Sequence, residues 1–298
     1  MADYRVEPVA NYHCACGENP LWDDRRQVAL WCDIPTGRLF RYDPAAGTHE
    51  CFYQAGDPNR PYGRLGSPDC VGGFTLQDDG RLLLFGAGRV WMIDDAGNEQ
   101  DVCRLDDPGI PRFNDVIADP AGRVLAGTMG KAKDSGGLFR LDRDGTLTCL
   151  FRGTGCSNGL GFTPDRAQVY WTDSTARRIW VFDYDAARGE LANRRLFHAC
   201  PPEEKTPDGL TVDAEGNIWT ARWDGFCIRV MSPQGQQIEK IDFPVGKVSS
   251  CIFGGGDWSD LYVTTAGGSP DSPAADGTLY RVRTSARGLP EFRSKVML

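Results

Sequence analysis

The sequence predicts an all-β protein, folded as one six-bladed β-propeller domain of four-stranded blades over residues 1–298. Two repeated patterns predict this fold. A short strand pattern, in which aliphatic or aromatic residues alternate with Arg, occurs six times, and a turn pattern of the type Asp-x-x-Gly precedes apolar runs at roughly regular spacing. No stretch shows a sustained 3.6-residue period with helix caps, so helices are not expected to build the fold.

The strand pattern marks the third strand of each expected blade. Its six copies cover residues 38–43, 89–94, 137–142, 178–183, 227–231 and 278–282. Alternation of this kind fits strands that pack sheet on sheet. Two β-sandwiches placed end to end would also contain many short strands, but they would need a linker near the middle of the chain, and none is visible. A propeller explains the copy number.

The third unit shows most clearly the order of strands within a blade. We expect its strands at residues 116–118, 123–128, 138–141 and 146–150. Residues 119–122 and 142–145 connect them as Asp-Pro-Ala-Gly and Asp-Arg-Asp-Gly, and these residue types favour tight turns. We expect each of the six units to supply four strands of its own in this way.

A polar residue lies five positions before the first turn in four of the six units. These residues are Glu18, Asn114, Asn158 and Asp208, counted back from Asp23, Asp119, Thr163 and Asp213. The same offset gives Gly72 and Cys251 in the other two units. The six positions are roughly 40 to 55 residues apart, which suits a repeat architecture. Because the first strand of each blade lines the central channel of a propeller, we expect the four polar side chains to converge at one end of the axis.

The loops between the second and third strands are expected to open at the same end of the axis. They cover residues 33–36, 86–88, 129–136, 173–177, 222–225 and 266–277. The third and the sixth of these loops are the longest. Long loops on one face of a scaffold usually carry selectivity, so these two loops are expected to influence the choice of ligand.

Glu18, Asn158 and Asp208 offer hard oxygen ligands for one divalent cation, with Asn114 as a candidate fourth ligand. Oxygen donors favour Ca²⁺, Mg²⁺ or Mn²⁺, and Zn²⁺ also accepts carboxylates. So few protein ligands leave coordination positions for water and substrate, which is typical of a catalytic metal. The alternative interpretation is that these polar residues cap turns and bind channel water without a metal.

Composition limits the partners of the protein. The net charge of -8 and the pI of about 5.0 disfavour nucleic acid and anionic membranes. No apolar run approaches the roughly 20 residues of a membrane span, and no signal-peptide pattern is visible. We therefore expect a cytoplasmic protein that is a monomer or a weak homo-oligomer.

The eleven cysteines are expected to be reduced, because cytosolic disulfides are rare and most of these residues lie in apolar strand-like runs. The sequence assigns no role to Cys14, Cys16 or Cys251. The three histidines share no blade position and are interpreted as surface or packing residues. A serine triad of the α/β-hydrolase type is not expected.

Four separated motifs resemble those of the senescence marker protein-30/gluconolactonase (regucalcin-like) family. They are Gly-Glu-Asn-Pro-Leu-Trp at 17–22, Arg-Phe-Asn-Asp at 112–115, Ser-Asn-Gly-Leu at 157–160 and Pro-Asp-Gly-Leu at 207–210. Asp-Ser at 173–174 and Ser-Ser-Cys-Ile-Phe-Gly-Gly at 249–255 also resemble the family. The resemblance covers nearly the whole chain in order. It implies a six-bladed propeller that hydrolyses sugar lactones with one divalent cation.

The resemblance also implies roles for particular residues. The metal ligands of the family fall on Glu18, Asn158 and Asp208, and its substrate-contacting residues fall on Arg112 and Asn114, the latter also a direct or indirect partner of the metal in many members. The third-blade loop departs from the animal members, because Gly-Lys-Ala-Lys-Asp at 130–134 lacks their sugar-binding Glu, so their sugar preference does not transfer.

The stretch 219–226 is closer to bacterial aldonolactonases. We therefore expect Lys131, Arg222 and Trp223 among the substrate-binding residues. Trp223, Arg222, Tyr62 and Phe226 would form a wall against which a sugar stacks, although aromatic residues are equally expected in blade packing.

The expected reaction opens an aldonolactone to its aldonic acid. The cation would act as a Lewis acid on the ring carbonyl, and Arg112 would donate a charge-assisted hydrogen bond to the lactone. Asp208 would accept the proton of the attacking water, with activation of that water by the cation as the competing mechanism. Two other functions stay open: a phosphotriesterase on the same centre, and a calcium-binding propeller without catalytic activity.

Overall fold

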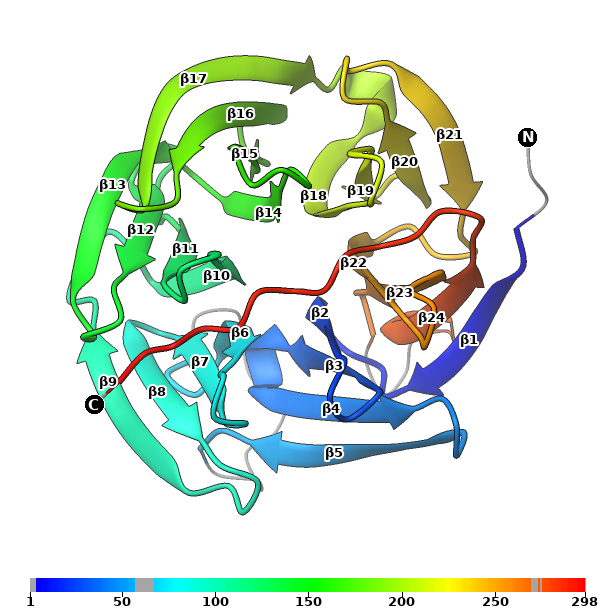
Figure 1. Cartoon of the computed structure of the whole chain (residues 1–298). Coiled ribbons are helices and arrows are strands. Elements are labelled where there is room, and N and C mark those ends of the chain that lie inside the picture. Colours follow the sequence, from blue (N-terminus) through cyan, green and yellow to red (C-terminus); the bar gives the residue numbers. More distant parts are fainter. Residues whose placement is uncertain (1–3, 57–66, 269–272, 274, 298) are drawn as a thin grey trace.

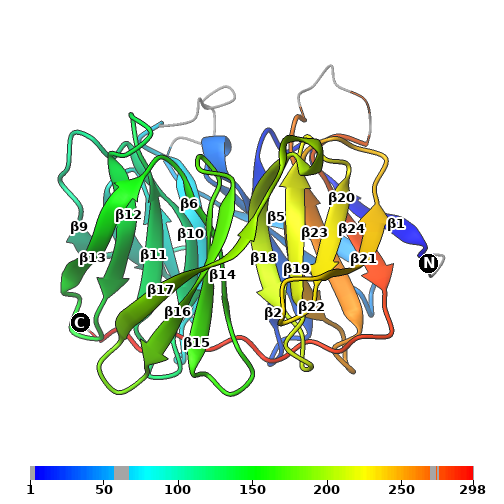
Figure 2. The ribbon, with the colours of Figure 1, turned by 90° about the horizontal axis from the view of Figure 1, so that it is seen from above.

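The computed structural model describes residues 4–56, 67–268, 273 and 275–297. These residues form 24 strands in six four-stranded antiparallel sheets, and the sheets are arranged as blades around a central axis (Figures 1 and 2). The prediction of an all-β, six-bladed propeller is confirmed. The two short 3-10 segments of the described chain, η1 (Ile34–Thr36) and η2 (Pro202–Glu204), lie in connections.

The first three blades follow the chain order, each from an inner first strand to an outer fourth strand. Blade 1 consists of β2 (Gly17–Asp23), β3 (Val28–Asp33), β4 (Arg38–Asp43) and β5 (Thr48–Gln54). Blade 2 consists of β6 (Val71–Leu76), β7 (Leu82–Gly86), β8 (Arg89–Ile93) and β9 (Glu99–Arg104). Blade 3 consists of β10 (Arg112–Ala118), β11 (Val124–Met129), β12 (Gly136–Leu141) and β13 (Leu147–Thr154).

Blades 4 and 5 repeat the same order, and blade 6 is assembled from both ends of the chain. Blade 4 consists of β14 (Ser157–Phe162), β15 (Gln168–Asp173), β16 (Arg178–Asp185) and β17 (Glu190–Ala199). Blade 5 consists of β18 (Thr206–Val212), β19 (Ile218–Trp223), β20 (Cys227–Met231) and β21 (Gln237–Asp242). Blade 6 consists of β22 (Val248–Gly254), β23 (Asp260–Thr265), β24 (Thr278–Arg283) and β1 (Val6–Asn11).

The outer strand of blade 6 corrects the expectation that every unit supplies four strands of its own. β1 pairs antiparallel with β24, in a register that places Val6 opposite Val282 and Asn11 opposite Thr278. A ring of sheets needs its last blade joined to its first, and hydrogen bonds between the two ends of the chain make that joint. The pairing therefore closes the ring and covers an edge of β24 that would otherwise be exposed.

The Asp-x-x-Gly turns form as predicted. In blade 3 the Asp119 carboxylate accepts hydrogen bonds from the backbone N–H of Ala121 and of Arg123, both at 2.8 Å. Gly122 closes the turn with a φ of +89°, a conformation that glycine adopts without steric cost. Because this turn fixes where β10 ends, it also fixes which residue lies five positions earlier in the strand.

The first strand of every blade carries a β-bulge near the predicted axial position. The pairing of first and second strands shifts register at Glu18/Leu21, Val71/Gly73, Phe113/Val116, Asn158/Leu160, Pro207/Leu210 and Val248/Ser250. A bulge interrupts the strict alternation of side chains and re-aims them. Neighbouring residues of these strands can therefore both face the channel.

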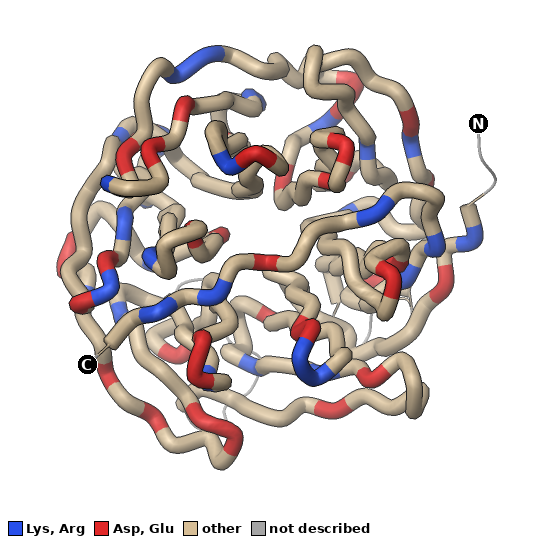
Figure 3. Tube along the Cα trace, in the orientation of Figure 1, with Lys and Arg blue, Asp and Glu red and all other residues tan. Residues whose placement is uncertain are grey.

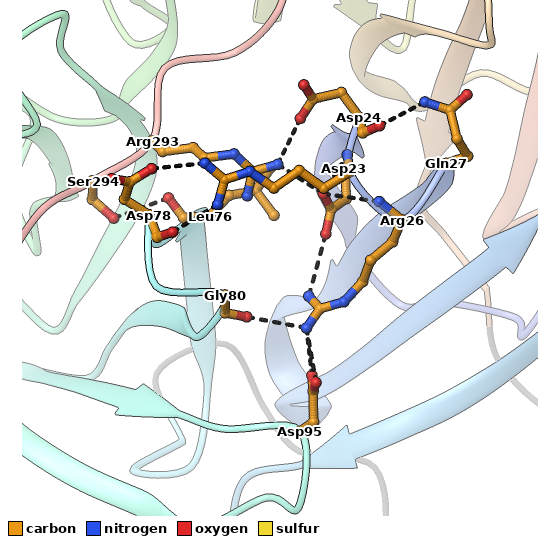
Figure 4. A network of polar contacts seen from close by, with 11 residues as sticks. Asp23, Asp24, Arg26, Gln27, Leu76, Asp78, Gly80, Asp95, Arg293 and Ser294 are labelled. Carbon is orange, nitrogen blue, oxygen red and sulfur yellow. Dashed lines mark hydrogen bonds and ion pairs between the residues drawn. The ribbon is translucent and has the colours of Figure 1, made fainter.

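Residues 284–297, which we name the C-terminal strap, cross the opposite end of the channel (Figures 1 and 2). The strap contacts all six blades through hydrogen bonds and one ring contact. Its partners are Asp23, Leu76, Gly122, Phe162, Ala214 and Ser259. Figure 4 shows the contact with blades 1 and 2, where Arg293 binds Asp23 and Asp24 at 2.8 Å and 2.6 Å. The strap therefore ties the blades together on the face away from the predicted site.

Charge is dispersed around the propeller. Both basic and acidic residues occur around the whole ring of blades, and neither sign is confined to one side of it (Figure 3). No helix in the described part of the chain is long and apolar enough to cross a membrane. All eleven cysteines lie in the described residues, and none of them forms a disulfide.

Candidate active site

A cavity of about 200 Å³ lies at the end of the channel opposite the strap. It is lined by Cys16, Glu18, Ile34, Arg112, Asn114, Met129, Cys156, Asn158, Ser174, Thr206, Asp208 and Trp223. The structure therefore brings together six of the residues named from the sequence: Glu18, Arg112, Asn114, Asn158, Asp208 and Trp223. Four of these belong to the first strands of blades 1, 3, 4 and 5, at the positions that the five-residue offset selected.

The two remaining offset positions contribute no side chain to this cavity, for separate reasons. A Cβ atom on Gly72 would lie only 2.1 Å from the backbone carbonyl oxygen of Phe113, so the crowding of β6 against β10 excludes a ligand there. The buried Cys251 thiol donates to the backbone carbonyl of Trp219 at 3.4 Å and is not part of the lining of this cavity. The polar residues therefore come from blades 1, 3, 4 and 5, and Glu18 on blade 1 lies across the axis from Asn158 on blade 4.

The two asparagines are held by a directed set of hydrogen bonds. Arg112 donates from Nη1 to Asn114 Oδ1 and to the backbone carbonyl of Phe113. Asn114 donates from Nδ2 to Asn158 Oδ1 at 2.9 Å and to the backbone carbonyl of Ser157 at 2.8 Å. Each amide therefore has a defined oxygen side, set by a neighbour that can only donate or only accept.

Three carboxylates lie near the axis, and all are at least nine-tenths buried. Glu18 is 5% exposed, Asp208 is 4% exposed and Asp115 is 8% exposed. Glu18 accepts a hydrogen bond from the backbone N–H of Asn19 at 3.2 Å. Among the described residues, no group donates a hydrogen bond to Asp208 or Asp115. A buried ionised carboxylate without a donor is costly, so these groups require a positive charge, water or a proton.

Burial raises the pKa of each of these acids, and repulsion by neighbouring carboxylates adds to the rise for Glu18 and Asp208. The pKa of Glu18 lies well above its ordinary value because of burial and the charges of Asp208 and Asp115. Burial and Asp115 raise the pKa of Asp208 in the same way, and the Arg112 guanidinium opposes the rise. Burial raises the pKa of Asp115 to about 7. One arginine therefore faces three acids, and this deficit of positive charge suits a divalent cation.

The residues fit a hard divalent cation. Glu18 and Asp208 supply carboxylate oxygens and Asn158 supplies an amide oxygen, which are the ligand types that Ca²⁺, Mg²⁺ and Mn²⁺ prefer. The orphaned Asp208 carboxylate faces the same cavity as Asn158 Oδ1. Arg112 also lines this cavity, and its buried Nε–H has no acceptor among the described residues.

Asp115 is a polar residue of this region that sequence reasoning missed. It lines a smaller cavity of about 30 Å³ in the channel, together with Asn19, Ser250 and Cys251. In a regular strand, the neighbour of Asn114 would point to the other side of the sheet. The bulge in β10 turns Asp115 toward the channel instead, and the sequence carries no readable signal for that bulge apart from the motif in which it lies.

The structure places the expected substrate residues Arg222 and Lys131 away from the lining of the cavity. The Arg222 side chain is fully buried, and it donates to Thr220 Oγ1 at 2.7 Å and to the Glu204 carboxylate at 3.3 Å. The long Arg222 side chain thereby pairs its charge with Glu204, a residue outside the lining of the cavity. Lys131 is exposed on the β11–β12 loop, where its backbone N–H donates to Gly109.

The proposed stacking wall is present only in part. Trp223 lines the cavity, and the Lys247 ammonium lies 5.3 Å from its ring centre. Phe226 is 53% exposed and is absent from the lining. Tyr62 lies outside the described residues. The apolar surface that the cavity offers therefore comes from Trp223 together with Ile34 and Met129.

Two cysteines of the cavity wall were not expected there. Cys156 Sγ accepts from the Nδ2 atoms of Asn114 and Asn158, both at 3.8 Å. Burial raises the pKa of the Cys156 thiol to about 12, so the thiol stays protonated at neutral pH and is a poor nucleophile. Cys16 is buried beside Glu18 on the opposite wall, and burial raises its pKa further above the ordinary value. Both cysteines therefore line the cavity without acting as nucleophiles.

A Gly-x-Ser-x-Gly spacing does occur once, at residues 155–159, although a serine triad was not expected. Ser157 begins β14 and is fully buried, and its Oγ accepts a hydrogen bond from Trp171 Nε1 at 2.7 Å. None of the three histidines, all of which are described, lines the cavity. The motif therefore lacks both the exposure and the base that a nucleophilic serine needs.

His198, Cys200 and Glu204 form a second cluster with potential metal-ligating atoms, all within 4.8 Å of one another. The Glu204 carboxylate is already paired with His198 at 2.9 Å and with Arg222 at 3.3 Å, and Arg229 lies at 4.0 Å. Two guanidinium groups beside the only carboxylate oppose the binding of a cation. We interpret this cluster as an ion-pair network that packs blade 4 against blade 5.

The fold and the cavity together define a class: a six-bladed propeller with a buried, acidic, oxygen-rich site at one end of its channel. The chain belongs to the SMP-30/gluconolactonase/LRE-like family, whose region it matches over residues 16–267. The family expected from the four motifs is thereby confirmed.

Relatives of known name cover the whole chain. The sequence is 41% identical over 303 residues to pentonolactonase XacC of Haloferax volcanii, covering 98% of this chain and 99% of the relative. It is 30% identical over 310 residues to regucalcin of Oryctolagus cuniculus, with the same two coverages. The fold is similar to a crystal structure described as a calcium-binding protein, regucalcin, from Agrobacterium tumefaciens, with a TM-score of 0.86, 24% identity and full coverage of both chains.

Proposed function

We propose that the protein hydrolyses a sugar lactone to its aldonic acid, with one divalent cation held by Glu18, Asn158 and Asp208. The observation that carries the proposal is the pair of buried carboxylates at the axis, one of which accepts no hydrogen bond from the described residues, beside an amide oxygen and the Arg112 guanidinium. Lactone hydrolysis is supported by the family and by the relative named pentonolactonase, and a pentonolactone is therefore the first substrate to assay.

The bound cation would supply Lewis-acid polarisation of the lactone carbonyl. Arg112 is fixed by its bonds to Asn114 and Phe113, and its remaining donors would bind a lactone oxygen. Asn114 uses its oxygen for Arg112 and its amide group for Asn158, so we assign it the role of orienting both neighbours. Ile34, Met129 and Trp223 would cover the C–H surface of the sugar ring.

Asp208 is the residue to which we assign the proton of the attacking water. Its carboxylate faces the cavity and accepts no hydrogen bond from the described residues, so an oxygen is free to accept that proton. Burial and the charge of Asp115 raise the pKa of Asp208 in the cation-free protein, and a bound cation would keep this carboxylate ionised and able to accept a proton. A general base of this kind contributes about 10²–10⁴-fold to a hydrolysis rate.

Calcium is the cation to test first, because a structural neighbour is described as calcium-binding. The same centre has the chemistry to bind a phosphotriester, whose polar P=O group would also face the cation. The polar wall formed by Arg112, Asn114 and Thr206 favours a hydroxylated substrate over an apolar ester. Hydrolysis of the phosphotriester alone would therefore overturn the assignment of substrate.

The test is an acid-release assay on chelator-treated protein, replenished separately with Ca²⁺, Mg²⁺, Mn²⁺ or Zn²⁺. The panel contains pentonolactones, gluconolactone and a phosphotriester. We expect hydrolysis of at least one lactone to disappear with the cation and to return with it. The Asp208→Asn variant should lose at least about 10²-fold in kcat while keeping its fold, since it loses the general base. Wild-type rates in this variant, or full activity in chelator, would contradict the proposal.

A further inference from the structure

Ser174 lines the cavity but has no part in the functions assigned above. It follows β15 directly, is 7% exposed, and lies between blade 4 and blade 5. Asn158 donates from Nδ2 to Ser174 Oγ at 3.0 Å, and Ser174 Oγ donates to the backbone carbonyl of Pro207 at 2.7 Å. The hydroxyl therefore connects the amide of Asn158 to the residue immediately before Asp208.

We propose that Ser174 is a positioning residue, which holds the Asn158 amide with its oxygen toward the cation. The inference rests on the proposed function, in that Asn158 is taken as a ligand. Ser174 would not bind the cation itself. It would act on the cation through Asn158, and on the strand that carries Asp208 through the carbonyl of Pro207.

The hydrogen-bond partners on the two sides of Asn158, Ser174 and Asn114, fix the orientation of its amide. A backbone carbonyl can only accept, so Ser174 must use its single O–H on Pro207, and toward Asn158 it can only accept. The NH₂ group of Asn158 must therefore point at Ser174. At the other end, Arg112 can only donate, so Asn114 turns its oxygen to Arg112 and its NH₂ group to Asn158 Oδ1.

Ser174 and Asn114 therefore each require the same orientation of the Asn158 amide, independently of each other. A chain of hydrogen bonds with one consistent direction runs from Arg112 through Asn114 and Asn158 to Ser174 and Pro207. Such chains polarise their members and are stronger together than singly. Without the Ser174 hydroxyl, the Nδ2 atom of Asn158 would keep only the weak contact with Cys156 Sγ at 3.8 Å. Rotation of the amide would then present N–H groups to the cation.

The chain offers a matched control on β15, the strand that ends just before Ser174. Thr172 lies two residues before Ser174 and is fully buried, and its Oγ1 has no hydrogen-bond partner in the described part of the protein. Thr172→Val therefore removes a buried hydroxyl of the same blade without removing a hydrogen bond. A general effect of lost polarity on blade 4 would appear in both variants, whereas an effect through Asn158 would appear only in Ser174→Ala.

The experiment measures Ca²⁺ affinity by calorimetry on chelator-treated protein, for wild type, Ser174→Ala, Thr172→Val, Asn158→Ala and the double variant Ser174→Ala/Asn158→Ala. Loss of a partner that orients a metal ligand typically weakens metal binding about 10- to 100-fold, and we expect this for Ser174→Ala. Thr172→Val should stay within about twofold of wild type, because it removes no bond to a ligand. Ser174→Ala should add less than about twofold once Asn158 is already alanine, since the pair then acts as one unit.

An affinity of Ser174→Ala within twofold of wild type would overturn the proposal, and so would an equal loss in the Asn158→Ala background. If the alanine variant does not fold, Ser174→Cys is measured instead, because it keeps the side chain near its size while its thiol is a weak donor and acceptor. Wild-type affinity in Asn158→Ala would overturn the ligand assignment of the proposed function. That result differs from the one that would overturn the proposal for Ser174 alone, in which Ca²⁺ affinity is weakened in Asn158→Ala but normal in Ser174→Ala.

Discussion

Asp115 allows a direct test of the electrostatics at the axis, because it is a buried acid that accepts no hydrogen bond from the described residues. We expect Asp115→Asn to stabilise the chelator-treated protein at pH 8. The substitution keeps the shape of the side chain and removes its charge. It also removes one source of the repulsion that raises the pKa of Glu18 and of Asp208.

The expected magnitude follows from the pKa of Asp115, which burial raises from 3.8 to about 7. A raised pKa means that the folded protein binds the proton more tightly than the unfolded chain does. The stability contributed by protonated Asp115 is therefore complete below pH 4 and is lost as the pH rises to about 7. At about 1.4 kcal/mol per pH unit, the loss is at most about 4 kcal/mol.

The assay is thermal and urea unfolding of wild type and Asp115→Asn at pH 5, 6, 7 and 8, with chelator and with excess Ca²⁺. The advantage of the variant should be roughly a third of its full value at pH 5 and grow to about 2–4 kcal/mol at pH 8, or roughly 4–16 °C in Tm at 2–4 °C per kcal/mol. Excess Ca²⁺ should reduce the difference, because the cation neutralises the same region. A variant that is no more stable than wild type at pH 8 in chelator would refute this reasoning.

Three further outcomes are expected. Glu18→Gln should weaken Ca²⁺ affinity about 10-fold or more, with most of its rate restored at saturating Ca²⁺; unchanged affinity in calorimetry would exclude Glu18 as a ligand. Arg293→Ala should lower the free energy of unfolding by about 2–3 kcal/mol, because it leaves Asp23, which is 1% exposed, without its strap partner. Urea unfolding measures this change. An effect below about 0.5 kcal/mol would mean that the strap is not held by this pair. Arg222→Met should reduce the free energy of unfolding through the loss of its bond to Glu204, while KM for the lactone changes little. A large rise in KM with normal stability would instead show that Arg222 binds the substrate.

The positions of the cavity side chains could be predicted from sequence because tight turns fix the count of residues. Asp119 closes its turn through its own carboxylate, so β10 ends at a defined residue and Asn114 comes a fixed distance earlier. The same reasoning located Glu18 and Asp208. The position of each cavity residue therefore depends only on local sequence, because the residues that form each turn lie within a few positions of one another.

Other features depend on contacts that no short segment contains. The bulge in β10, which turns Asp115 to the channel, arises where β10 and β11 change register. The direction of the Arg222 side chain depends on Glu204, which lies in the connection before β18. The pairing of β1 with β24 joins residues from opposite ends of the sequence. The role proposed for Ser174 likewise depends on Pro207, a residue of the next blade.

The strap also has a kinetic consequence. Residues 284–297 cross the channel at one end, whereas the β15–β16 and β19–β20 loops, next to the cavity residues Ser174 and Trp223, lie at the other end (Figure 2). We expect the cavity to open to solvent at that other end. A substrate and its product must then pass through the same opening in turn. The product should therefore act as a competitive inhibitor, which raises the apparent KM for the lactone without changing kcat. Variation in the loops around that opening would change release and selectivity together.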